Sequence, residues 1–280
     1  GDALHYQALL QTIRSEDLAD PELYARVEQM MDVDNFATYH IVELFFAGRD
    51  WPQNNIKFWR PRTADGRWRW LLYDADSTFG GGANFDSLAR LLVPSSPGAT
   101  PAWASELFRG LFASPSFRDA FITRFCDLLN GPLGPERTVG LLRMGLGTIA
   151  HEMLRHLARW RHDRPAESAL TQWQGFDASM SAWLEARPNH VRAHLAAHFG
   201  LAGEYTLSIE ADPPGSGTFH LTAVDVEAPY SGRYFTGVPI QVTAIPAPGL
   251  EFAGWGPDLP ESPTLRLTPE GDTTLRATFR

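Results

Sequence analysis

Two short polar motifs lie on either side of a predicted β-hairpin. Asp50 is followed five positions later by Asn55, and Asp74 is followed two positions later by Asp76. Phosphoryl transfer requires a carboxylate that accepts a hydroxyl proton, together with an amide and a carboxylate that hold a hard cation such as Mg²⁺. The spacing therefore indicates phosphoryl-transfer chemistry. The alternative that Asp50 and Asp74 only terminate secondary structure, as Asp often does, stays open.

A hairpin between these motifs would bring them together. Residues 56–59 and 68–73 are short apolar and aromatic runs, and Ala64-Asp65-Gly66 between them has the composition of a turn. We expect the returning strand to place Asn55 and Asp74 at the same end of the hairpin. Asp74 and Asp76 would also share one strand face if the strand persists to that point.

The same residues carry a resemblance to a known family. Arg49, Asp50 and Asn55 reproduce the end of the protein-kinase catalytic loop, H-R-D-x-x-x-x-N. The stretches MDVDNFATYHIVELFFAGRDWPQNNIKFWR and RWRWLLYDADSTFGG resemble the CotH family of atypical secreted protein kinases, and the resemblance extends from residue 1 to about residue 200.

The resemblance implies a role for each polar residue. Asp50 would be the catalytic Asp, and Arg49 would brace its loop. Asn55, with Asn54 beside it, would be the amide of the catalytic loop. Asp74 would hold Mg²⁺ or Mn²⁺ against the phosphates of ATP together with Asn55, with Asp76 as a further metal ligand or as a support for Asp74.

The implied activity is transfer of the γ-phosphoryl group of ATP to Ser or Thr hydroxyls of a protein substrate whose identity the sequence does not give. The implied location is extracellular or at the cell surface. Three alternatives stay open. In the first, the chain is a non-catalytic cell-surface binding or structural protein that kept the fold. In the second, it transfers another group, such as AMP, with the same residues. In the third, it is a glycosidase built on paired carboxylates, a reading that leaves Asn55 without a role.

Some features depart from the kinase pattern. Gly48 stands where many relatives carry Asn, and no Gly-rich loop precedes Asp50, because the 49 residues before it have helical patterns. Lys57 is the single lysine, and it follows the catalytic loop instead of preceding it. Gly80-Gly81-Gly82 is expected to be a flexible connector. We therefore expect this chain to be an excised part of a longer precursor, with the nucleotide-covering lobe and an export signal upstream of Gly1.

Composition excludes some classes of partner. The formal net charge of −9 over 280 residues argues against a nucleic-acid binder, which needs a basic surface to displace counterions. Since no apolar run reaches the length of a membrane span, we predict none. Cys126, in the apolar run FITRFCDLL, is expected to be a small buried hydrophobic residue.

The pattern of the chain changes near residue 203, which predicts an α+β fold with two domains, a CotH-like domain over 1–203 and a small all-β module over 204–280. Asp20-Pro21 has the composition of a helix start, and Asp34 is expected to cap the next helix. Helices are predicted near 3–14, 21–31, 34–47, 102–112, 115–130, 136–161, 167–186 and 189–199.

Alternating stretches from residue 204 on predict strands, and GVPIQVTAIPAPGLEFAGW resembles the InlB B-repeat-like modules of secreted bacterial proteins. Phe252 and Trp255 are expected in the core of this module.

Overall fold

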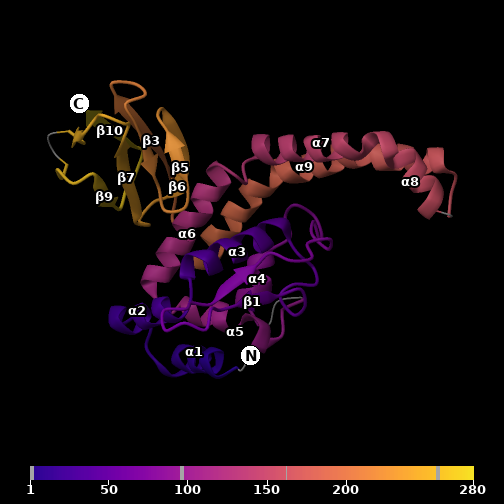
Figure 1. Cartoon of the computed structure of the whole chain (residues 1–280), viewed down its shortest axis with the longest axis horizontal. Helices are drawn as coiled ribbons and strands as arrows, with labels where there is room; N and C mark the ends of the chain where they lie inside the picture. Colours follow the sequence, from indigo (N-terminus) through magenta and orange to yellow (C-terminus); the bar gives the residue numbers. More distant parts are fainter. Residues whose placement is uncertain (1–2, 95–97, 162, 257–258) are drawn as a thin grey trace.

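The computed structural model describes residues 3–94, 98–161, 163–256 and 259–280. Helices dominate up to residue 199, and two β-sheets follow from residue 204, so the fold is α+β as predicted. Figure 1 shows the helical body below the β-sheets and a long helical arm, formed by α7, α8 and most of α9, that projects from the body.

Two of the first three helices begin at a side-chain cap. The three helices are α1 (Leu4–Ser15), α2 (Pro21–Met30) and α3 (Val33–Phe46). Asp20 caps α2 by accepting from the amide of Glu22 at 2.8 Å, with Pro21 at the first helical position. The cap of α3 is Asp32, so the prediction of Asp34 is wrong. The amide of Asp32 donates to the carbonyl oxygen of Trp68, which holds Asp32 outside the helix.

The predicted hairpin forms between α3 and the later helices. Strands β1 (Lys57–Trp59) and β2 (Arg69–Leu71) pair antiparallel. The inner face of the hairpin is aromatic: Phe58 stacks on Tyr6 of α1 with ring centroids 4.7 Å apart, and Trp70 meets Phe36 of α3 edge-on at 4.6 Å. This packing fixes the hairpin against the helical body and thereby positions both of its ends.

Helices α5 (Ala102–Leu111) and α6 (Pro115–Asn130) lie where the sequence predicts them, but α4 (Ser87–Leu92) was not predicted. Asp86 caps α4 by accepting from the amide of Ala89 at 2.8 Å. The helix is only six residues long, which is too short for a clear hydrophobic period.

The arm differs from its prediction in two places. The helix expected over 136–161 is interrupted, as α7 (Pro135–Ile149), a 3₁₀ turn η1 (Ala150–Glu152) and α8 (Met153–Trp160). The two helices expected on either side of Pro188 are one, α9 (Ala166–Phe199). Pro188 removes one helical hydrogen bond. It is nevertheless buried together with Arg187, and this packing holds the helix continuous.

The C-terminal part is a pair of four-stranded sheets, ordered β6-β3-β10-β8 and β5-β4-β7-β9. All pairs are antiparallel except β3 with β10. The strands are β3 (Glu204–Asp212), β4 (Gly217–His220), β5 (Asp225–Glu227), β6 (Tyr230–Phe235), β7 (Ile240–Pro246), β8 (Phe252–Gly254), β9 (Thr264–Leu267) and β10 (Thr273–Phe279). Trp255 is buried and Phe252 packs against the same core, which confirms the prediction that both are core residues.

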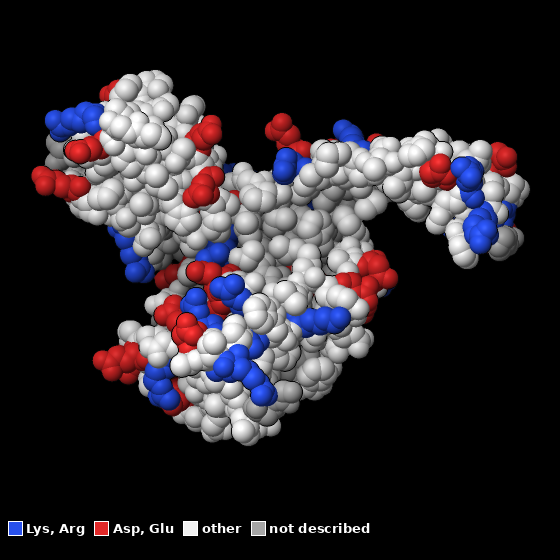
Figure 2. Space-filling model, viewed as in Figure 1, with Lys and Arg blue, Asp and Glu red and all other residues white. Residues whose placement is uncertain are grey.

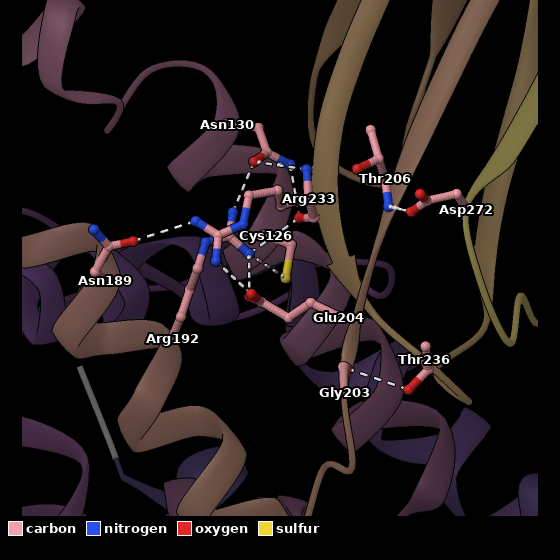
Figure 3. A network of polar contacts seen from close by, with 10 residues as sticks. All are labelled: Cys126, Asn130, Asn189, Arg192, Gly203, Glu204, Thr206, Arg233, Thr236 and Asp272. Carbon is pink, nitrogen blue, oxygen red and sulfur yellow. Dashed lines mark hydrogen bonds and ion pairs between the residues drawn. The ribbon is translucent and has the colours of Figure 1, made fainter.

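A polar network joins this β-sheet pair to the helices (Figure 3). Arg192 of α9 donates to Oδ1 of Asn130 on α6 at 2.7 Å, to the carbonyl oxygen of Arg233 on β6 at 3.0 Å and to Oε1 of Glu204 at 3.3 Å. Cys126 is buried beside it, as predicted, and burial raises the pKa of its thiol to about 12. The helices and the sheets therefore share one continuous interface.

Charges of both signs are interspersed on the face drawn in Figure 2. Among the described helices, none combines the length and apolar character that crossing a membrane requires.

Candidate active site

The loop that carries Asp50 begins directly after α3 and is held at several backbone atoms. The amide of Arg49 donates to the carbonyl oxygen of Ser77 at 3.0 Å, which joins this loop to the segment that follows the hairpin. On the other side, the guanidinium of Arg90 on α4 donates to the carbonyl oxygens of Gly48 and Arg49, each at 2.7 Å. These bonds fix the backbone from which Asp50 extends.

Asn55 links the two polar motifs. Its Nδ2 donates to Oδ2 of Asp50 at 2.7 Å and makes a longer contact of 3.4 Å with the carbonyl oxygen of Asp74. The hairpin thus brings Asn55 and Asp74 together, as the sequence predicts. Both residues have positive φ, 53° and 54°, in the left-handed region that Asn and Asp enter more readily than most side chains.

The prediction of a shared strand face for Asp74 and Asp76 is wrong. Strand β2 ends at Leu71, and the positive φ of Asp74 turns the chain out of the extended conformation before Asp76. Asn54 and Asp76 are both exposed. Within the described residues, no hydrogen bond joins either side chain to the rest of the site.

The donor atoms that remain suit a magnesium ion. Nδ2 of Asn55 donates to Asp50. The amide oxygen Oδ1 of Asn55 is therefore the atom left to bind a cation. The carboxylate of Asp74 is the second donor. Mg²⁺ uses one or two protein carboxylates and takes its remaining oxygens from water and substrate phosphates. In the part of the chain that the structure describes, no group of three or more His, Cys, Asp or Glu residues forms a cage for a metal, so an ion at Asn55 would depend on such external oxygens.

The glycine segment after Asp76 is packed, although the sequence indicates a flexible connector. A Cβ added to Gly80 would lie 1.9 Å from Cγ of Arg49, and the amide of Gly80 donates to the carbonyl oxygen of Ala47 at 3.2 Å. The carbonyl oxygen of Gly81 accepts from Nε1 of Trp183 on α9 at 3.2 Å. The glycines therefore allow close contact between this segment, the Asp50 loop and α9.

Glu43 is a buried carboxyl that sequence reasoning missed. It lies one turn before the end of α3 and is 4% exposed. Burial and the nearby charge of Asp50 raise the pKa of Glu43 to about 7. A Cβ at Gly48 would lie 2.9 Å from Oε2 of Glu43, so a larger side chain at this position would have to displace the carboxyl group. The only signal in the sequence was a single charge within the apolar run HIVELFF.

Replacing Glu43 with Gln is expected to change how stability depends on pH. The folded-state pKa of about 7 lies above the ordinary value of 4.5, so the folded protein binds this proton more tightly than the unfolded chain does. The stabilisation is full below pH 4.5 and is lost as pH rises through about 7. Relative to Glu43→Gln, the wild type should lose up to about 3 kcal/mol of unfolding free energy across this interval.

Urea unfolding at about pH 5 and about pH 8 measures this difference. Glu185→Gln on the exposed side of α9 is the matched control, and it should follow the wild type. A Glu43→Gln variant with the same pH dependence as the wild type would contradict the assignment.

Arg187, also missed, ties the end of α3 to the segment after the glycines. It is 1% exposed, and burial lowers its pKa to about 10, so it remains charged at neutral pH. Its guanidinium donates to four carbonyl oxygens and one hydroxyl, those of Leu44 (2.7 Å), Phe45 (2.8 Å), Ala83 (2.8 Å), Phe85 (2.6 Å) and Ser87 (3.0 Å). No sequence pattern identifies it, because most of its partners are backbone atoms.

Comparison with known proteins identifies the family of this chain. A family model described as CotH kinase protein matches residues 1–191. No curated protein and no solved structure gives a match. The matched region contains the Asp50 loop, the hairpin, Asp74 and Arg187, and it covers more than half of the 280 residues. The chain therefore belongs to the CotH kinase family.

Proposed function

We propose that this chain is an atypical protein kinase that transfers the γ-phosphoryl group of ATP to Ser or Thr hydroxyls of a protein. The observation that carries the proposal is the position of Asn55, whose amide contacts both the Asp50 carboxylate and the backbone of Asp74. A base for the hydroxyl and two oxygen donors for a cation thus converge at one end of a rigid hairpin.

Each residue has a distinct task in this reaction. Asp50 orients the acceptor hydroxyl and takes its proton as the oxygen bonds to the γ-phosphorus and the bond to the β–γ bridging oxygen breaks, so that ADP leaves. Mg²⁺ or Mn²⁺, when bound, would offset negative charge on the phosphates. Asn55 and Asp74 supply oxygens for that ion and keep the loop in place, Asp76 adds a further carboxylate nearby, and Arg49 braces the loop.

The test is label transfer from ATP to protein by this chain. With γ-labelled ATP and Mg²⁺ or Mn²⁺, we expect label on protein hydroxyls, and excess EDTA should abolish it. Label from α-labelled ATP on the product would instead indicate AMP transfer, and the product mass separates the two. A folded wild type that neither binds ATP nor transfers label would favour a non-catalytic surface protein.

The proposal extends to organisation and location. We infer a CotH-like catalytic domain over residues 1–203 and a small InlB B-repeat-like module over 204–280, supported by the change from α9 to β3 between Phe199 and Glu204. The module would space or attach the catalytic domain at the cell surface. Spore-coat proteins need not be its substrates.

A further inference from the structure

Lys57 is the only lysine in the sequence, and it lies beside the candidate active site. It is the first residue of β1, two positions after Asn55. Its ammonium nitrogen Nζ is 3.3 Å from the centroid of the Tyr73 ring, a cation–π contact. Tyr73 in turn directly precedes Asp74. The contact therefore lies at the end of the hairpin that carries the polar site.

The pairing of the strands places this contact on the outer face of the hairpin. Lys57 is opposite Leu71, and Tyr73 lies two residues further along the same face. Three apolar side chains on this face are close to half exposed: Trp59 (46%), Leu71 (48%) and Tyr73 (45%). Lys57 is itself exposed, so its ammonium group has room to move away from the ring.

Two arginines near the site, Arg90 and Arg69, are already engaged by protein atoms. Arg90 donates to the carbonyl oxygens of Gly48 and Arg49. Arg69, at the other end of the outer face, forms an ion pair of 2.9 Å with Asp32. Lys57 instead rests on an aromatic ring. That contact is weaker than a charge-assisted hydrogen bond to a phosphate oxygen, so an arriving phosphate can replace it.

The neighbouring charges make a cation necessary here. Asp50 and Asp74 would repel the phosphates of a nucleotide, and a metal ion offsets only part of this repulsion. A phosphate-pairing cation elsewhere in kinases precedes the catalytic loop. In this chain, β1 directly follows the loop, and its first residue, Lys57, is exposed. Lys57 is therefore placed to supply such a cation.

We propose that the ammonium group of Lys57 leaves the Tyr73 ring when a nucleotide binds and then contacts the phosphates of that nucleotide. In the absence of nucleotide, the cation–π contact keeps the ammonium group next to the site. This inference rests on the proposed function, because it assumes that phosphates bind at Asn55 and Asp74. It adds a substrate-binding residue on the hairpin.

A single lysine permits a direct test by NMR. Protein labelled with ¹³C only at lysine gives signals from one side chain, and the ring current of Tyr73 should shift its ε-methylene signal upfield. ATP or inorganic tripolyphosphate with Mg²⁺ should move the signal back toward the position of a free lysine, and adenosine should not. Tyr73→Leu should show the unshifted position without any ligand.

Calorimetry on the same samples measures affinity. Lys57→Met keeps the aliphatic stem and removes the charge, and it should weaken binding of both ATP and tripolyphosphate about tenfold or more. Lys57→Arg should recover part of the loss. Arg69→Met, which removes a charge from the far end of the same face, is the matched control and should bind like the wild type.

Two results would overturn the inference, and they differ in meaning. If wild type binds ATP while the lysine signal does not move and Lys57→Met binds equally well, Lys57 has no role and the proposed kinase function stands. If wild type binds neither ATP nor tripolyphosphate, the proposed function fails together with the inference.

Discussion

Asp50→Asn is expected to lower the rate of phosphoryl transfer on the order of 10³-fold, within the range for removal of a general base. An amide at position 50 offers an oxygen to Nδ2 of Asn55, so the hydrogen bond of 2.7 Å that positions the loop has a replacement partner. The proton acceptor, however, is lost. We therefore expect the affinity for MgATP to change only a few-fold, and initial-rate measurements with calorimetry separate the two effects.

The matched control is Asp65→Asn, which makes the same chemical change in the exposed turn of the hairpin. Its rate should equal that of the wild type. Full activity in Asp50→Asn would remove Asp50 from the mechanism. A large loss of MgATP affinity in that variant would show that Asp50 acts chiefly as a metal ligand.

Arg187→Met is expected to destabilise the fold by about 4 kcal/mol or more, an exceptionally large effect for one substitution. Buried ion pairs are often replaceable by apolar residues, but Arg187 binds carbonyl oxygens of two backbone segments. Methionine would leave these acceptors buried without their donors, and each orphaned group costs about 1–3 kcal/mol. Urea unfolding monitored by circular dichroism measures the loss.

Arg143→Met provides the comparison for Arg187→Met. Arg143 lies on α7 with 60% of its side chain exposed and pairs with Asp177 at 3.3 Å. Exposed pairs of this kind contribute about 0–1 kcal/mol, so the variant should unfold close to the wild type. Equal stability of the two variants would mean that water replaces the guanidinium of Arg187, and that its bonds do not hold the site.

Local signals in the sequence predicted much of the fold. Asp20-Pro21 marks the start of α2, the turn Ala64-Asp65-Gly66 marks the hairpin, and the change to alternating patterns marks the strands from residue 204. These predictions succeeded because caps, turns and periodicity act within a few residues. The same reasoning anticipated that Asn55 and Asp74 meet, since a hairpin reverses the chain over a short distance.

Predictions failed where a contact distant in sequence overrides a local preference. The bond from the amide of Asp32 to Trp68 moves the cap of α3 away from Asp34. Burial of Pro188 and its neighbour keeps α9 continuous, and the left-handed backbone of Asp74 ends the strand before Asp76. Each of these outcomes depends on packing partners that no window of neighbouring residues contains.

The sequence by itself therefore determined the residues to which we assign the chemistry: the types and spacing of Asp50, Asn55 and Asp74, and the elements that carry them. Only the tertiary structure decided how that chemistry is supported. Arg187 holds the end of α3 from more than a hundred residues away, Glu43 is buried beneath the Asp50 loop, and Lys57 rests on the Tyr73 ring. The sequence specifies the type of each side chain, whereas burial and long-range hydrogen bonds exist only once distant segments pack together.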